Sequence, residues 1–391
     1  MSLSPIKIAL LSKGRSHLWD LFMAMEQCGA DVTFYSDLPK MRLRKFGLKD
    51  QATHSFFANC ALSYALQKLN LMPSLSTDIN YRYLCSLDRA VSKRLAPCDL
   101  LIGLSGLTLF TAKAAKAKYK AQFWLERGSV HILEQKKIMN EIANIPSSSL
   151  VPDWSIEREL EGYDLADKIV VPSSHVAKTF YQNGINPKKV FVNSYGVNLD
   201  DFPVTQTPQS KRPTIIFVGG WTYRKGCDLL NQLIVKTPEI DLIHVGSPGD
   251  CPFPNTPNFT SVGHVPQRNL TKYYETAHLL IHASREEGMS LTLAQALASG
   301  LPIVATPMTG AIDLISKIAI PEAIKIVSEP SVENLISDIR SQLKLFPSVD
   351  RRKDILGDCR DSLSWLSSAK DYLTEIESHF NPVKLNKGRI G

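Results

Sequence analysis

Two adjacent glutamates open a segment that is otherwise almost free of charge. Glu286 and Glu287 begin the run EEGMSLTLAQALASGLPIVAT, in which residues 288–306 carry no ionisable side chain. The run predicts a helix from about Ser290, then a glycine stop and a buried strand. The helix dipole stabilises carboxylates at this end, so the pair could simply cap the helix. Alternatively, Glu287 could accept hydrogen bonds from sugar hydroxyls, with the following N–H groups facing phosphate or sugar oxygens.

A second candidate site follows the apolar run TIIFVGG. Gly219 and Gly220 allow a tight backbone there, and Arg224 and Lys225 stand just before a predicted helix. Free N–H groups and the positive end of the helix dipole, together with two cations, suit a phosphate group. A glycine-rich turn with two solvated cations fits the same residues. The pattern is not a Walker P-loop, because G-x-x-x-x-G-K-[ST] is absent.

The elements that must position these loops alternate between strand and helix. IKIALLS, HLWDLFMAMEQCG and DVTFYS are typical of a strand, a helix and a strand, and DLLIGLS, AQFWLE and KIVVPS are further strand candidates. The pattern restarts after residues 198–213 with TIIFVGG, DLIHVGS, HLLIHAS and PIVATP. This predicts an α/β protein with two doubly wound, Rossmann-like domains that face a central cleft. We place the domains at residues 1–200 and 201–391, with a last helix over 364–380 that packs back on the body.

Composition excludes several classes of protein. The 391 residues are 44% hydrophobic and 21% charged, which is typical of a globular rather than a disordered chain. Seven scattered cysteines without a C-x-x-C pair argue against a disulfide framework and a zinc site, and we expect no metal. The N-terminus lacks the pattern of a signal peptide, so we expect a cytoplasmic protein. Residues 288–306 could imitate a membrane span, but Gln295, Gly300 and Pro302 interrupt them.

The charge is unevenly distributed along the chain. The formal net charge is +7, and all of this excess lies in residues 1–200, mainly in the runs at 38–49 and 111–120. Such runs are often solvated helix faces and loops. They could also form a surface that meets anionic lipid or an anionic acceptor. No basic stripe interleaved with aromatic residues is present, so we do not expect a nucleic-acid partner.

Four segments, taken together and in their order, resemble a known family. They are LADKIVVPSSHVAKTF, VFVNSYGVNLDDF, GWTYRKGCDLL and EEGMSLTLAQALASGLPIVATPMTG. They look like the retaining glycosyltransferases of the glycosyl transferases group 1, or family 4, type, over roughly residues 120–375. This resemblance implies the GT-B fold. It also implies that the C-terminal domain binds a nucleotide-sugar donor and that the N-terminal domain binds the acceptor.

The resemblance assigns the donor side residue by residue. The family has two glutamates separated by seven residues, and Glu287 matches the first of them, near the donor sugar. Lys225 matches the basic residue that meets the donor pyrophosphate, and Arg224 could replace a family arginine whose position is Gly220 here. The family's usual Phe-Gly pair is Met-Ser in this chain. The implied donor-binding set also contains Gly219, Gly288, Met289, Ser290 and Leu291.

Gln295 stands where the family has its second glutamate, which contacts the nucleotide ribose. A charge-assisted hydrogen bond contributes about 1.5 to 3 kcal/mol and a neutral one about 0.5 to 1.5 kcal/mol, so roughly 1 kcal/mol of binding is lost. Because an amide also donates, a changed choice of donor is an equal expectation. A helix-surface glutamine without a role is the alternative.

On the acceptor side, the family commonly has a histidine near the cleft edge, close to the reacting sugar. FWLERGSVHI offers His131, which is offset from the commonest position, and Arg127, which could occupy that position instead. A lone histidine is more often structural, so both roles stay open for His131. The first loop, SKGRS, lacks the family's frequent double glycine and leaves Gly14, with Arg15 beside it, as the candidate acceptor contact.

We therefore expect a retaining glycosyltransferase that uses a nucleotide sugar as co-substrate and needs no metal or other cofactor, since the chain has no D-x-D pair. The expected acceptor is a glycan, a lipid-linked molecule or a small molecule. Peripheral contact with an anionic membrane through the N-terminal domain, on the inner face, is a further expectation. The alternative is a nucleotide-sugar-binding protein without turnover. A glycosidase is less expected, because nothing identifies a second carboxylate.

Overall fold

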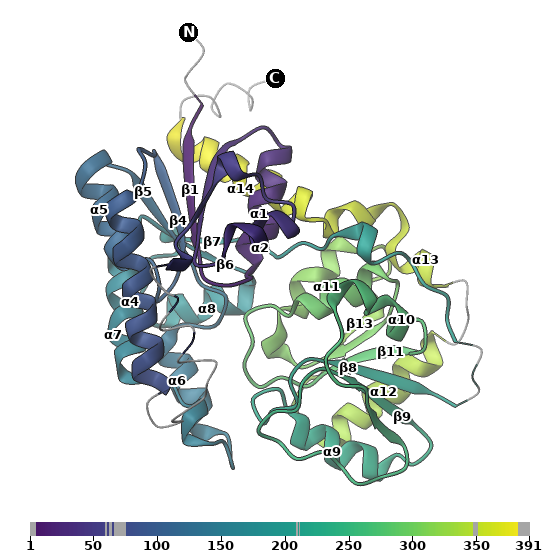
Figure 1. Cartoon of the computed structure of the whole chain (residues 1–391). Coiled ribbons are helices and arrows are strands. Elements are labelled where there is room, and N and C mark those ends of the chain that lie inside the picture. The colour runs from purple at the N-terminus through teal and green to yellow at the C-terminus, as the bar shows by residue number, and fades with distance from the viewer. Residues whose placement is uncertain are drawn as a thin grey trace.

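The computed structural model describes residues 5–58, 61, 65, 76–208, 210, 212–346 and 351–381. Two parallel β-sheets form two units that lie side by side, and helices cover both faces of each sheet (Figure 1). Each apolar run of the sequence that precedes a candidate loop forms a buried strand, for example Thr214–Val218 and Leu279–His282. The carboxyl ends of parallel strands meet at one edge of a sheet, and this edge carries the loops discussed below.

The N-terminal unit contains a seven-stranded sheet in the order β3-β2-β1-β4-β5-β6-β7, and all pairs are parallel. Its strands are β1 (Lys7–Ser12), β2 (Asp31–Ser36), β3 (Thr53–Ser55), β4 (Leu100–Leu104), β5 (Gln122–Glu126), β6 (Lys168–Val171) and β7 (Val190–Val192). Its helices are α1 (His17–Gln27), α2 (Lys40–Lys45), α4 (Ser76–Arg94), α5 (Leu109–Tyr119), α6 (Ile132–Glu141), α7 (Asp153–Leu165) and α8 (Ser174–Gln182). A short 3-10 helix, η3 (Ser147–Ser149), separates α6 from α7.

The C-terminal unit contains a six-stranded parallel sheet in the order β10-β9-β8-β11-β12-β13. Its strands are β8 (Thr214–Val218), β9 (Asp241–Val245), β10 (Phe259–Ser261), β11 (Leu279–His282), β12 (Ile303–Ala305) and β13 (Ile324–Ile326). Its helices are α9 (Cys227–Lys236), α10 (Thr271–Tyr274), α11 (Leu291–Ala298), α12 (Val332–Leu345) and α13 (Arg351–Leu356), followed by the 3-10 helix η10 (Gly357–Leu363).

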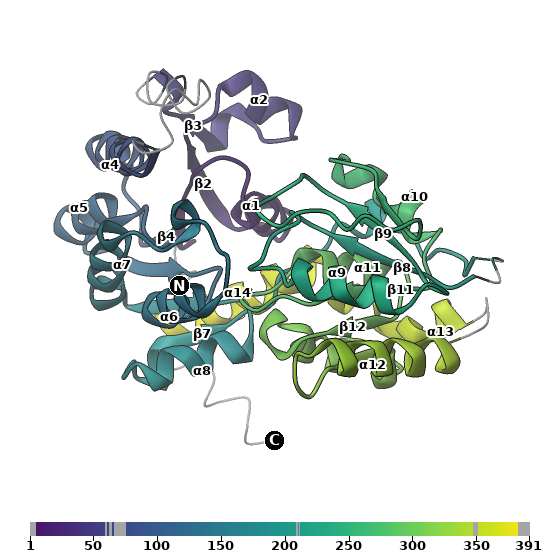
Figure 2. The ribbon, with the colours of Figure 1, turned by 90° about the horizontal axis from the view of Figure 1, so that it is seen from below.

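The last described helix, α14 (Trp365–Phe380), returns to the N-terminal unit and packs on α1 (Figure 2). Where it starts, Val197 N donates to Leu363 O at 2.8 Å and Trp365 N donates to Val197 O at 3.2 Å. These bonds join the segment in which the chain leaves the N-terminal unit to the segment in which it returns. Along α14, the Tyr372 ring stacks on Trp124 at 5.6 Å. The expectation that a last helix packs back on the body is confirmed.

Candidate functional site

The loop after β8 forms a tight turn that leads into α9. Gly226 precedes the helix with φ 70°, and a Cβ there would lie 2.1 Å from Ala283 O, so only glycine fits. Gly219 has φ 150°, and its carbonyl oxygen lies 2.9 Å from His244 Nε2. Because the turn is fixed in this way, Arg224 and Lys225 are both held at the carboxyl edge of the sheet.

Both cations of this loop pair with the two glutamates of the loop after β11. Arg224 Nη1 lies 3.0 Å from Glu286 Oε2, and Lys225 Nζ pairs with the Glu287 carboxylate. Burial, and then the nearby Arg224, lowers the pKa of Lys225 to about 7. Burial opposes ionisation of Glu286, but Arg224, Ser129 and Arg127 outweigh it and lower the pKa of this carboxyl group. The glutamates thus hold the cations that could meet an anionic ligand.

Glu286 also joins the two units. Its side chain is fully buried, and Ser129 Oγ, from the loop after β5, donates to its Oε1. Gln135 Nε2 of α6 lies 3.5 Å from Oε2 of the same carboxylate. Arg127 lies behind this contact, with Nη1 2.7 Å from Glu159 Oε1 and Nη2 2.7 Å from Gln135 Oε1. The structure therefore gives Arg127 an internal network of its own.

Gly288 lies against the loop after β5 of the opposite unit. A Cβ on Gly288 would lie 2.0 Å from Gly128 O and 3.0 Å from Ser129 N. Met289 is buried, and Ser290 stands at the N-cap position of α11, whose first residue is Leu291. The helix predicted from about Ser290 is therefore present. Ser290 N donates to Thr309 O at 3.3 Å, so this N–H group already has a partner.

Gln295 lies in the middle of α11 and is only 4% exposed. The alternative of a helix-surface glutamine is therefore wrong, because α11 is enclosed by neighbouring elements. Within the described residues, Gln295 Oε1 is buried without a hydrogen-bond partner. Buried polar atoms are nearly always satisfied, so this acceptor is a natural contact for a ligand hydroxyl.

His131 caps α6, because its Nδ1 accepts from Leu133 N at 3.3 Å. The ring lies 5.0 Å from the rings of Tyr163 and Phe180 and is 2% exposed. Burial, and then Arg127, lowers the pKa of His131 to about 4. These surroundings fit a structural role better than contact with a substrate.

The first loop of the N-terminal unit lies at the same edge of its sheet. Gly14 has φ 57°, and its N–H donates to Asp37 Oδ1 at 2.7 Å. The Arg15 guanidinium lies over the Phe46 ring at 5.1 Å. Lys13 Nζ donates to Asn80 Oδ1 at 2.8 Å, which connects this loop to α4.

Sequence reasoning missed a second group of residues at this edge. His17 Nε2 lies 3.2 Å from Glu126 Oε2, and the His17 ring stacks on Tyr195 at 4.4 Å. A Cβ on Gly128 would lie 2.9 Å from the Tyr195 hydroxyl oxygen, so this group reaches the loop that contacts Gly288. In the sequence, only the position of Glu126 at the end of a predicted strand pointed to this group.

A cavity of about 330 Å³ lies beside the paired cations. Gly220, Thr222, Arg224, Lys225 and Asp250 of the C-terminal unit line one part, and Gln135, Met139 and Ser149 of the N-terminal unit line the other. Ser149 Oγ lies 3.2 Å from Asp250 Oδ2 across the opening. The cavity thus offers cations, a glycine-rich backbone and polar side chains from both units.

No metal-binding cluster is found in the part of the chain that the structure describes. Among these residues, no three His, Cys, Asp or Glu side chains lie together as metal ligands would. The described helices also include none that is long and apolar enough to cross a bilayer.

Known structures share this architecture and define its class as the GT-B fold of glycosyltransferases. Sucrose-phosphate synthase from Thermosynechococcus elongatus superposes with a TM-score of 0.71 at 17% identity, covering 96% of this chain and 99% of that one. HepE from Anabaena, solved with UDP and glucose, superposes with a TM-score of 0.63 at 12% identity, covering 95% of this chain and 100% of that one. Likenesses at such low identity concern the fold, and the predicted fold is confirmed.

The sequence comparisons support the resemblance to the family. Residues 212–343 match the model described as glycosyl transferases group 1. One component of phosphatidylinositol N-acetylglucosaminyltransferase from Arabidopsis thaliana is 23% identical over 223 residues, which are 53% of this chain and 48% of that protein. The chain spans about half the length, or less, of the curated relatives that it matches.

Proposed function

We propose that this protein transfers a sugar from a nucleotide-diphosphate sugar to an acceptor, with retention of anomeric configuration and without a metal. The observation that carries the proposal is the cavity between the units, which Arg224 and Lys225 line and beside which Lys225 pairs with Glu287. Cations and oriented N–H groups stabilise the charge that develops on a departing diphosphate. HepE, whose fold is shared, was solved with UDP and UDP-glucose.

In the proposed reaction, the bond between the anomeric carbon and the diphosphate oxygen breaks, and an acceptor oxygen bonds to the anomeric carbon on the same face. The acceptor proton passes to the departing phosphate oxygen, so no additional base is required. Lys225 and Arg224 exchange their glutamate partners for the diphosphate oxygens. Glu287, released from Lys225, accepts hydrogen bonds from the sugar hydroxyls. Gln295 forms hydrogen bonds with the ribose hydroxyls of the nucleotide.

A panel of nucleoside diphosphates and nucleotide sugars tests the donor site by thermal shift. Ligand at 100 times its dissociation constant stabilises a protein by about 2.7 kcal/mol, which a thermal scan detects. We expect one nucleotide to stabilise the wild type and to lose this effect in Lys225→Ala. Lys236→Ala, which removes an exposed lysine at the far end of the same helix, is the matched control. Stabilisation of both variants alike would contradict the proposal.

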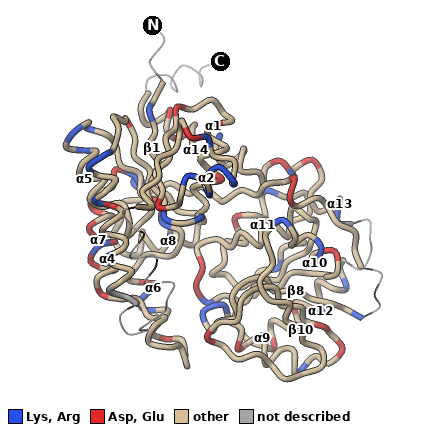
Figure 3. Tube along the Cα trace, viewed as in Figure 1, with Lys and Arg blue, Asp and Glu red and all other residues tan. Residues whose placement is uncertain are grey.

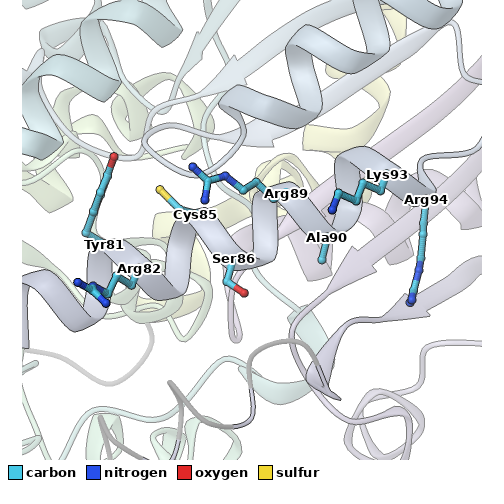
Figure 4. A pocket seen from close by; sticks show the side chains of 8 residues that line it. All are labelled: Tyr81, Arg82, Cys85, Ser86, Arg89, Ala90, Lys93 and Arg94. Atoms are coloured by element: carbon cyan, nitrogen blue, oxygen red, sulfur yellow. The ribbon is translucent and has the colours of Figure 1, made fainter.

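We further propose that the acceptor is anionic, either lipid-linked or a phosphate-bearing glycan. Basic residues follow one another along α4, beside a cavity of about 530 Å³ (Figure 4). Within the described residues, no ion pair is found for Arg82, Arg89, Lys93 or Arg94. More lysines lie on the neighbouring α5 (Figure 3). The relative from Arabidopsis thaliana carries phosphatidylinositol in its name, which supports a lipid acceptor.

Co-sedimentation with vesicles of phosphatidylcholine and phosphatidylglycerol tests the lipid-linked form of this proposal. We expect binding that falls as salt rises and that Arg89→Ser with Lys93→Ser weakens, because each basic residue near anionic headgroups contributes about 1 kcal/mol. Lys344→Ser, on the other unit, is the control. Vesicle binding that neither salt nor the double variant changes would contradict the lipid-linked form of the proposal. The anomeric configuration of the transferred sugar, read by NMR, tests retention.

A further inference from the structure

Three consecutive residues at the start of α8 form hydrogen bonds with the C-terminal unit. Ser173 Oγ donates to Gly288 O at 2.7 Å, and His175 Nε2 lies 2.8 Å from Glu287 O. Ser174 donates from both its N and its Oγ to the Asp313 carboxylate, at 3.0 to 3.1 Å. The segment Ser173–His175, called the α8 clamp below, therefore bonds to the backbone of the loop that carries Glu287.

The same loop is held from its other side by the N-terminal unit. Gly128 O is in contact with Gly288, and Ser129 Oγ donates to the Glu286 carboxylate. Residues 286–288 therefore lie between two loops of the opposite unit. These contacts add to those that Arg224 and Lys225 of the same unit make with the loop, so both units hold its observed conformation.

The hydrogen-bond chemistry fixes the state of the His175 ring. A carbonyl oxygen only accepts, so Nε2 must carry the proton that points at Glu287 O. Nδ1 faces Ser173 Oγ at 3.0 Å. Burial lowers the pKa of His175 to about 4, and the ring is consequently neutral near pH 7. The partly buried imidazole is held in one tautomer by the bond from Nε2 to Glu287 O, and this suits a group that orients another.

Resting on the proposed transfer reaction, we infer that His175 is a positioning residue. Through the bond from His175 to the Glu287 carbonyl, the N-terminal unit orients the Glu287 side chain and the N–H groups that follow it for catalysis. The donor can bind to Lys225 and the surrounding cavity without this bond. The reacting sugar meets a correctly placed Glu287 only when the units close. The α8 clamp thus links closure to the chemical step, and it limits attack by water on a donor bound in the open form.

Hydrogen–deuterium exchange tests the clamp without any knowledge of the substrate. In His175→Ala we expect faster exchange at the amides of residues 287–290 than in the wild type. Ser149→Ala, which removes a contact between the units outside this loop, is the control and should leave these amides unchanged. Equal exchange in the wild type and in His175→Ala would overturn the inference, whatever the activity.

Kinetics with the donor found by thermal shift separate positioning from a merely structural role. Misplacement by about 1 Å can cost on the order of 100-fold in rate, so we expect kcat of His175→Ala to fall roughly tenfold to 100-fold. The donor dissociation constant should change less than about twofold, because the Lys225 cavity is intact. His175→Gln places an amide N–H near the position of Nε2 and should recover much of the rate.

These outcomes distinguish the inference from the proposed function. A fall in donor affinity equal to the fall in rate would overturn positioning, because it would assign His175 to ground-state binding. If the wild type binds and turns over no nucleotide sugar, the proposed function fails. Faster exchange in His175→Ala would then still establish the clamp, and its inferred role in sugar transfer would be overturned together with that function.

Discussion

Gly288→Ala is the sharpest test of the closed arrangement. The added Cβ would lie 2.0 Å from Gly128 O, whereas ordinary van der Waals contact begins near 3.4 Å. The two loops must therefore separate by about 1.4 Å, the difference between these two values. Separation lengthens the bonds from Ser129 to Glu286 and from Ser173 to Gly288 O. The strain acts between the units and is relieved by opening, so each unit should stay folded.

A displacement of about 1 Å in a catalytic site can cost on the order of 100-fold in rate. We therefore expect release of nucleoside diphosphate from the donor to slow at least tenfold in Gly288→Ala, with nucleotide binding retained. Small-angle X-ray scattering should report a larger radius of gyration. Gly220→Ala is the control for the radius of gyration. Its Cβ would lie 3.8 Å from the nearest atom, so this variant should not separate the units. An unchanged rate and radius in Gly288→Ala would refute the reasoning.

Two further predictions concern the donor cavity. Burial lowers the pKa of Lys225 to about 7, so the unliganded protein must take up a proton to bind a diphosphate above that pH. Nucleotide affinity, measured by calorimetry, should be nearly constant below pH 7 and fall by up to about tenfold per pH unit above it, and Lys225→Ala should bind weakly with little pH dependence. Gln295→Glu should strengthen nucleotide binding by about 1 kcal/mol, because a carboxylate accepts more strongly from ribose hydroxyls. Without ligand, Gln295→Glu should unfold at a lower temperature than the wild type, since it buries a charge. If its nucleotide affinity equals that of the wild type, the ribose binds elsewhere.

The fold was largely predictable from the sequence because its signals are local. TIIFV and LLIH are short apolar runs between turn residues, and both form buried strands of the parallel sheet. The start of α11 near Ser290 was likewise predictable from the local sequence. The donor loops could be located for the same reason, since each one directly follows a strand.

The partners of the site residues could not be predicted, because they come from distant parts of the chain. Ser129 and Glu286 are 157 residues apart, and His175 and Glu287 are 112 residues apart. His175 lies within a segment that carried the family resemblance, yet its type alone gave no sign of what its ring contacts. His131, by contrast, was singled out by type and is held among aromatic rings at the start of α6. Spacing cannot reveal which histidine faces which carbonyl.

The return of α14 to the N-terminal unit affects the order in which the protein can be completed during synthesis. Residues 7–192 supply every strand of the first sheet, but the Trp124 ring is covered by Tyr372 of α14. On the ribosome, this hydrophobic surface stays without its partner until the entire second unit has been made. The first unit to begin folding is therefore the last to be finished. The emerging chain must keep an apolar face out of contact with other chains for most of its translation.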